Sequence, residues 1–285
     1  MAIDYRGKVA LVTGASSGIG YVTARAFAAR GAIVVGVARR EPLLQRLAAE
    51  CRTHSPASGY LAGDLGERAF AERVVDDTVA RHGRLDVLVN NAAVSKHKQL
   101  YHLSADEVEQ VMRVNFLSAV WTTFAAIPHM LRQGDGTIVN VSSFAAKVVP
   151  PRETAYAASK AALSAFTEGL WNDLAGSNIH AALVVPGPID TEIWEKEDEP
   201  GAYEGRKYPP EIVADAILEV IEKRRYEVVV PRRNPPLVTA RLLRLFVPAL
   251  LRLGMARWEP VPPQIVERAR ERARRGKRLG DLSEG

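Results

Sequence analysis

Short apolar runs rich in β-branched residues recur along the first 231 residues, and longer segments with helical spacing separate them. The runs predict strands at Val9–Thr13, Ile33–Val37, Gly59–Ala62, Leu85–Asn90, Gly136–Ser142, His180–Val185 and Glu227–Pro231. The segments between them predict helices near 18–30, 41–53, 67–82, 104–132, 154–175 and 210–225. Because near-continuous apolar strands alternate with helices, we expect an α/β fold with a doubly wound parallel sheet of about seven strands and helices on both faces. Ligands of such a sheet bind at the carboxyl ends of its strands.

Two regions break this alternation. Residues 187–210 form a long charged connection that contains Trp194 and Tyr203, and loops of this length in compact domains are commonly functional. The second region runs from Arg232 to the end and is rich in arginine. We therefore expect one domain over residues 1–231, including the 187–210 loop, and a basic, partly helical extension over 232–285.

The positive charge of the chain lies in that extension. The chain has 38 Lys and Arg against 33 Asp and Glu, a net charge of +5, and residues 232–285 hold 13 against 5. The first 231 residues are left with 25 against 28, which is close to neutral. The pI of about 9.4 therefore gives no reason to expect specific nucleic-acid binding.

Cysteine content and hydropathy bear on the compartment. Cys51 is the single cysteine, so we expect no internal disulfide, which fits a reducing compartment. Met1–Arg6 is short and polar, so we expect no signal peptide. The chain has no run of about 18–20 uninterrupted apolar residues, so we expect no spanning helix. We expect a cytoplasmic protein, with peripheral membrane contact as an open alternative, and no metal site.

A glycine-rich turn over residues 13–20 follows the first predicted strand and opens a helix. Gly14 permits the tight turn, while Gly18 and Gly20 let the helix N-terminus approach a pyrophosphate closely. A plain glycine-rich turn would have the same composition. The strand-to-helix context favours dinucleotide binding.

The end of the second predicted strand bears on the choice of nicotinamide cofactor. A ribose 2′-hydroxyl needs an acidic residue there, whereas a 2′-phosphate needs a cation. The chain has Ala38 at the expected acidic position, followed by Arg39 and Arg40. Because guanidinium groups bind phosphate with paired hydrogen bonds, we expect NADP(H) in preference to NAD(H). A solvated arginine at a helix start is the alternative.

Two polar residues follow other strands of the predicted sheet. Asp64 comes after the third strand, where a carboxylate can meet the adenine, and Asn90 ends the fourth, where its amide can bracket the adenosine ribose. Ordinary turn chemistry explains each of them equally well.

Tyr156 and Lys160 are four residues apart in an alanine-rich segment, which places both on one face of a helix. A phenol with a pKa near ~10 is a poor acid or base at neutral pH. A neighbouring ammonium lowers that pKa, so we expect Lys160 to bring the phenol nearer the useful range. Ser143 offers a hydroxyl to a substrate oxygen, and Asn115 is suited to anchor backbone or a water of a proton relay. The alternative is an ordinary helix-surface pair, which the positions of Ser143 and the glycine turn disfavour.

Together these motifs resemble those of the single-domain short-chain dehydrogenases/reductases. The matching segments are TGASSGIG at 13–20, NNAA at 90–93, Asn115, Ser143, YAASK at 156–160 and PGPIDT at 186–191, in the family's order. The resemblance implies a Rossmann-type, dinucleotide-binding catalytic domain over residues 1–231. Tyr156 would be its general acid/base and Ser143 would position the carbonyl. Lys160 would also bind the nicotinamide ribose, and Asn115 would support the proton relay.

The resemblance also implies the residues that contact the cofactor. They are Gly14, Ser16, Ser17, Gly18, Ile19, Gly20, Arg39, Arg40, Asp64, Leu65, Asn91, Ala92, Tyr156, Lys160, Pro186, Gly187, Ile189 and Thr191. Three departures stand beside this set. Ala93 replaces a frequent glycine, and Ser17 replaces a basic residue that is a common NADP signal. Residues 228–236 replace a segment that often closes tetramers, so the implied homo-oligomer is either a dimer or a tetramer.

The start of the extension, Leu237–Trp258, is mostly apolar but carries four arginines. At about 100° per residue, Arg241, Arg244 and Arg252 fall on one side, and Pro248 is expected to kink or split the helix. The apolar face either packs on the domain or a second subunit, or rests on an anionic membrane or covers the substrate mouth. We expect residues 267–278 to form an exposed helix.

The leading hypothesis is an NADP(H)-dependent ketone or aldehyde reductase, or a secondary-alcohol dehydrogenase. Candidate apolar walls, which suggest a lipophilic substrate, are Phe116, Phe144, Val148, Val149, Trp194 and Tyr203. A non-catalytic dinucleotide sensor or scaffold is one alternative, although no catalytic side chain is missing. A lyase or epimerase on the same fold, which recycles its cofactor, is the other.

Overall fold

The computed structural model describes residues 3–194, 203, 205–258 and 261–274. Seven strands form one parallel sheet in the order β3-β2-β1-β4-β5-β6-β7. The strands are β1 (Val9–Thr13), β2 (Ile33–Ala38), β3 (Gly59–Ala62), β4 (Val87–Asn90), β5 (Gly136–Val141), β6 (Ile179–Pro186) and β7 (Glu227–Val230). The predicted doubly wound sheet is confirmed. The strand order reverses between β1 and β4, and the crevice at that point is where such sheets bind ligands.

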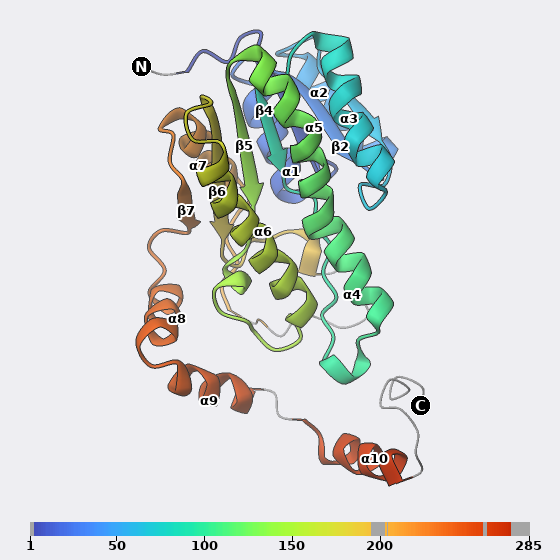
Figure 1. Cartoon of the computed structure of the whole chain (residues 1–285), viewed down its shortest axis with the longest axis vertical. Coiled ribbons are helices and arrows are strands. Elements are labelled where there is room, and N and C mark those ends of the chain that lie inside the picture. Colours follow the sequence, from blue (N-terminus) through green and yellow to red (C-terminus); the bar gives the residue numbers. More distant parts are fainter. Residues whose placement is uncertain (1–2, 195–202, 204, 259–260, 275–285) are drawn as a thin grey trace.

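Helices cover both faces of the sheet (Figure 1). One face carries α1 (Gly18–Ala28), α2 (Glu41–Arg52) and α7 (Glu211–Glu222), and the other carries α3 (Arg68–His82), α5 (Ser118–Gln133) and α6 (Thr154–Asp173). In β1, Ala10 and Val12 pack on the first layer, while Val9 and Leu11 pack on the second. All four are buried. A strand buried on both faces must be apolar throughout, which explains the runs in the sequence.

The single helix predicted near 104–132 is divided in the structure. It consists of α4 (Ala105–Met112), a π-helical turn (Arg113–Leu117) and α5. A capping box begins α4: the Ser104 hydroxyl accepts from the Glu107 amide at 3.2 Å, and the Glu107 carboxylate accepts from the Ser104 amide at 2.9 Å. The turn inserts an extra residue beside Asn115, and such turns are frequent at functional sites.

By length and composition, Ala105–Gln133 is also apolar enough to cross a membrane, and among the described helices it alone meets that test. In this fold it packs beside α3 and α6. The buried apolar side chains of the segment, such as Ala126 and Met130, belong to the core, whereas Phe124 and Leu131 are exposed.

The described part of the extension is largely helical and leaves the sheet at the β7 edge (Figure 1). It comprises α8 (Pro235–Phe246), α9 (Pro248–Trp258) and α10 (Pro263–Arg274). The split predicted at Pro248 is confirmed, since Val247 leaves helical geometry with φ −140° and ψ 61°. Asn234 caps α8 by accepting from the Leu237 amide at 3.1 Å. The end of the helix predicted over 267–278 lies outside the described residues.

Candidate active site

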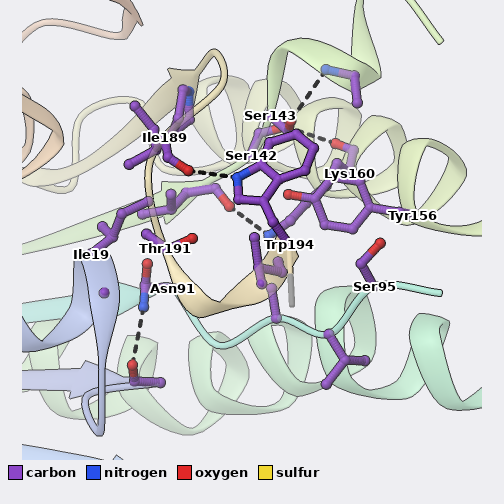
Figure 2. A pocket seen from close by; sticks show the side chains of 18 of the residues that line it. Ile19, Asn91, Ser95, Ser142, Ser143, Tyr156, Lys160, Ile189, Thr191 and Trp194 are labelled. Carbon is purple, nitrogen blue, oxygen red and sulfur yellow. Dashed lines mark hydrogen bonds between the residues drawn. The ribbon is translucent and has the colours of Figure 1, made fainter. Parts of the chain in front are cut away.

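A cavity of about 610 Å³ lies at the carboxyl ends of the central strands. Figure 2 shows Ile19 and Asn91 toward one end of it and Tyr156 and Ser95 toward the other. Most of the residues predicted to bind cofactor or to act in catalysis line this one space. They are Gly14, Ser16, Ser17, Gly18, Ile19, Arg39, Arg40, Asp64, Leu65, Asn91, Ala92, Ser143, Tyr156, Lys160, Pro186, Gly187, Ile189 and Thr191.

The glycine turn is packed too tightly for side chains. Gly14 has φ +67°, which favours glycine, and a Cβ atom on Gly20 would lie 2.3 Å from the Gly14 carbonyl oxygen. The Asn91 amide donates to the carbonyl oxygen of Thr13 at 3.0 Å, and the Thr13 hydroxyl accepts from the Asn91 backbone amide at 2.9 Å. Gly20 itself does not line the cavity. Its small size is what lets the turn close.

Asn90 has a different place from the one predicted. Its amide donates to the Asn140 side chain at 2.9 Å and to the Thr123 hydroxyl at 3.2 Å, and its oxygen accepts from Thr122 at 2.8 Å. The side chain is buried between strands and α5 rather than in the cavity. Successive side chains of a strand point to opposite sides, so the next residue, Asn91, faces the cavity instead.

Both arginines after β2 line the cavity. The Arg40 guanidinium donates to the hydroxyls of Ser16 at 3.1 Å and Ser17 at 2.7 Å, and it lies 2.9 Å from the Glu192 carboxylate. Arg39 is exposed at the rim. Asp64 accepts from the Gly66 amide at 2.8 Å while it lines the cavity, so it serves turn chemistry and remains available to a ligand.

The end of β5 and the first turns of α6 hold Ser143, Tyr156 and Lys160. The ammonium of Lys160 donates to the Val141 carbonyl at 2.8 Å and lies 5.9 Å from the centre of the Tyr156 ring. The Ser142 hydroxyl donates to the Lys160 carbonyl at 2.9 Å, which ties the strand end to the helix. A hydrogen bond joins Tyr156 to Ser143.

Burial dominates the electrostatics of the tyrosine and lysine. Loss of water raises the pKa of Tyr156, the negative charge of Glu153 raises it further, and the Ser143 hydrogen bond lowers it in part. Burial lowers the pKa of Lys160 to about 7. The expectation that Lys160 lowers the Tyr156 pKa is therefore not met in this structure, because burial of the phenol outweighs an ammonium held on Val141.

Asn115 anchors backbone, which is one of its two predicted tasks. Its side chain accepts from the Val94 amide at 2.8 Å and donates to the Val94 carbonyl at 2.8 Å. It also donates to the Ser159 hydroxyl at 3.0 Å. Asn115 does not line the cavity, so it acts on the site through the segment after β4 and through α6.

The apolar walls were predicted in part. Phe144, Val148, Trp194 and Tyr203 line the cavity. Phe116 and Val149 do not: the Phe116 ring packs edge-on against Phe166, and Val149 is 47% exposed.

Sequence reasoning missed three residues near Tyr156, and it placed the apolar face of the extension on the domain only as one of several alternatives. Ser95, His97 and Glu153 line the cavity near Tyr156, and Leu237, Ala240 and Met255 of the extension close another side. The last three pack against Phe144 and Val148. The inner face of α8 and α9 therefore packs on the domain and covers part of the cavity mouth. The sequence feature that indicates this packing is the apolar face of Leu237–Trp258, opposite the arginines.

Comparisons with known proteins agree with this geometry. The short chain dehydrogenase family profile matches residues 8–201. The 11-beta-hydroxysteroid dehydrogenase 1A of Arabidopsis thaliana is 41% identical over 191 residues, covering 66% of this chain and 54% of the plant protein. The 3-oxoacyl-(acyl-carrier-protein) reductase FabG of Thermotoga maritima is 36% identical over 219 residues, covering 74% and 89%. The chain thus spans about half the length of the plant relative.

Two solved structures are similar over most of the chain. A short-chain dehydrogenase from Sphingobium yanoikuyae in complex with NADPH has a TM-score of 0.73 at 26% identity and covers 90% of this chain and 97% of that one. An alcohol dehydrogenase from Thermococcus sibiricus, complexed with 5-hydroxy-NADP, has a TM-score of 0.70 at 26% identity, covering 80% and 98%. The chain belongs to the short-chain dehydrogenase/reductase family, whose members named here are oxidoreductases.

Proposed function

We propose that this protein is an NADP(H)-dependent oxidoreductase that interconverts a ketone or aldehyde and an alcohol. One observation carries the proposal: Ser143, Tyr156 and Lys160 line the same cavity as the glycine turn and the arginines after β2. Residues 1–231 would form the catalytic domain, with 187–210 on its substrate side, and 232–285 the extension. A sensor or scaffold would need the nucleotide residues but not this catalytic group.

The glycine turn and the arginines fit a phosphorylated dinucleotide. The missing Cβ atoms of the turn let backbone amides approach a pyrophosphate, and Ala38 leaves the end of β2 without a carboxylate that would repel a 2′-phosphate. Arg39 and Arg40 supply cations at the same place. The NADPH and 5-hydroxy-NADP named for the two similar structures support the choice of NADP(H).

The side chains supply the acid half of a carbonyl reduction. When bound, NADPH supplies the hydride that reaches the carbonyl carbon. Ser143 holds the carbonyl oxygen, and Tyr156 donates its proton to that oxygen. Burial raises the pKa of Tyr156, so the phenol holds its proton at neutral pH and is a weaker acid than an exposed phenol. Lys160 is assigned to the nicotinamide ribose, and Asn115 holds the segment beside the site.

Cofactor choice is tested by Arg39→Asp. We expect the KM for NADPH to rise about 10- to 100-fold, since a charged hydrogen bond is lost and a repulsive charge is added, while use of NADH is retained or improved. Initial rates with both cofactors measure this, and Arg233→Asp makes the same charge change at an exposed residue outside the cavity. An unchanged ratio of kcat/KM for the two cofactors would refute the assignment.

The reaction class is tested with a panel of ketones, steroids, sugars and fatty acyl compounds. The apolar walls formed by Phe144, Val148, Trp194 and Leu237 favour lipophilic ketones. We expect net loss of NADPH absorbance with such a ketone and a much slower loss of NADH. Product formation without net consumption of either cofactor would show the lyase or epimerase alternative instead.

We also propose that the outer face of α8 and α9 contacts an anionic membrane surface. Its large apolar side chains are exposed, among them Leu245 at 65% and Phe246 at 76%, and Arg241 and Arg252 are exposed beside them. This combination complements anionic headgroups and acyl chains. The protein would then be cytoplasmic with peripheral membrane contact, and its substrate would be lipophilic.

Vesicle flotation tests this contact. We expect the full chain to float with phosphatidylglycerol vesicles at low salt and to be released at high salt, because exposed charges are screened. Leu245→Glu should abolish flotation, whereas Leu100→Glu, at a position 70% exposed on the domain, should not. No flotation of the intact protein would eliminate the proposed membrane contact.

The other proposed partner is a second copy of this chain. Phe124 and Leu131 on α5 are exposed, which supports this proposal, and light scattering measures the mass of the assembly.

A further inference from the structure

The substrate side of the cavity contains a buried histidine–glutamate pair that the proposed reaction does not use. His97 lies in the segment after β4 and is 2% exposed, and Glu153 precedes α6 and is 6% exposed. Their closest atoms, His97 Nδ1 and Glu153 Oε1, are 2.6 Å apart. The Ser95 hydroxyl donates to the other carboxylate oxygen at 3.2 Å. All three residues line the cavity.

The other ring nitrogen of His97 contacts the connection that follows β6, at Ile193. His97 Nε2 lies 3.1 Å from the Ile193 carbonyl oxygen. The His97 ring also stacks on Trp194, with ring centres 5.8 Å apart and planes within 1°. The Trp194 indole in turn donates to the Ile189 carbonyl at 2.6 Å, as Figure 2 shows. His97 is thus the link between the start of α6 and the Ile193–Trp194 wall.

Counting donors fixes the protonation of this link. A carbonyl oxygen only accepts, so Nε2 must carry a proton to bond to Ile193. A contact of 2.6 Å between Nδ1 and a carboxylate oxygen also needs a proton between them. The pair therefore holds one proton more than a neutral imidazole beside a carboxylate. After loss of that proton, the imidazole has a single N–H group, which can donate either to Glu153 or to the Ile193 carbonyl but not to both.

We propose that His97 and Glu153 position the Ile193–Trp194 wall of the cavity on the substrate side. This positioning requires the proton that the two side chains share. His97 is a positioning residue, because it reaches the substrate through Trp194. Removal of the shared proton weakens the bond to Ile193, and the indole then loses its fixed place. Nearby ionisable groups are Tyr156 on α6 and Lys207, whose ammonium lies 4.9 Å from the centre of the Trp194 ring. The catalytic consequence rests on the proposed function.

Trp194 fluorescence tests whether His97 positions the indole, and it does so without any catalytic turnover. An imidazolium stacked on an indole quenches its emission, so the difference between the full chain and its Trp194→Phe variant should change with pH in one step. His97→Gln should remove that step, and His54→Gln, at an exposed histidine outside the cavity, should keep it. Glu153→Gln gives a second loss variant, should His97→Gln fail to fold. No step in the full chain, or the same step in both loss variants, would overturn the proposal.

Kinetics separate positioning from a general structural role. With a ketone found by the panel, His97→Gln should raise the substrate KM about 10-fold at low pH and flatten its pH dependence. The NADPH dissociation constant should stay within about twofold, because the nucleotide end of the cavity is untouched. Parallel loss of kcat, NADPH binding and thermal stability, with the pH profile unchanged, would show a structural role only. If no ketone is reduced, the proposed function fails, but the fluorescence result still shows whether His97 positions Trp194.

Discussion

Tyr156→Phe should lower kcat about 10²- to 10⁴-fold and leave the dissociation constant of NADPH within about twofold. Phe keeps the ring that packs in the cavity beside Ser143 and Lys160 and removes only the phenolic hydroxyl group. Without it, the oxygen of the reduced carbonyl must take a proton from water. Steady-state kinetics with the best ketone of the panel measure the rate, and NADPH fluorescence titration measures the binding.

Tyr60→Phe is the matched control for this variant. The Tyr60 hydroxyl donates to Glu41 at 3.0 Å, away from the cavity, so its loss should change kcat less than twofold. A Tyr156→Phe enzyme with a near-normal rate would mean that another group supplies the proton. A variant that loses NADPH binding as well would show that the phenol acts in the nucleotide site.

Gly20→Ala should weaken NADPH binding by about 100-fold or more and lower thermal stability. The new Cβ atom would lie 2.3 Å from the Gly14 carbonyl oxygen and 2.6 Å from the Asn91 amide nitrogen, so the turn must open to admit it. Overpacking of this kind costs about 1–3 kcal/mol, and here the displaced atoms are those that shape the pyrophosphate site. Fluorescence titration and thermal unfolding measure the two effects.

Gly169→Ala is the control, since Gly169 also lies in a helix but no atom beyond its chain neighbours and the backbone of its own helix stands within 4 Å of its Cβ position. Alanine favours helix over glycine by about 1 kcal/mol, so this variant should bind NADPH normally and unfold at an equal or higher temperature. Normal NADPH affinity in Gly20→Ala would contradict the role given to the turn.

The layout of the sheet was predictable because its physical cause is local. Strands such as β1 and β6 are buried on both faces, and each therefore appears as a nearly continuous apolar run. The π-helical turn was not predictable in this way. It contains Asn115, whose side chain bonds to Val94 and Ser159, 21 and 44 residues away in the chain.

The candidate site was predictable where a motif follows a strand. Thr13–Gly20, Arg39 and Ser143 come directly after β1, β2 and β5, and the fold brings such ends together. Asn90 ends β4 with its side chain buried away from the cavity, while Asn91 of the implied cofactor set faces the cavity. Burial reversed the expected direction of the Tyr156 pKa shift, and a sequence does not give the burial of a side chain.

Other parts of the site depend on contacts between distant segments. His97 meets Glu153 and Ile193 across 56 and 96 residues, and no local spacing marks such a pair. Leu237 and Met255 reach the cavity from helices whose inner face was ambiguous between the domain, a second subunit and a membrane.

Isotope transfer is the most direct measurement of the central claim. NADPH in which both hydrogens at C4 of the nicotinamide are replaced by deuterium is incubated with the protein and its best ketone, and the product is analysed by mass spectrometry. We expect an alcohol with one deuterium on the former carbonyl carbon and an equal amount of NADP⁺. Product without deuterium, formed while the labelled cofactor stays intact, would contradict a reductase whose proton donor is Tyr156.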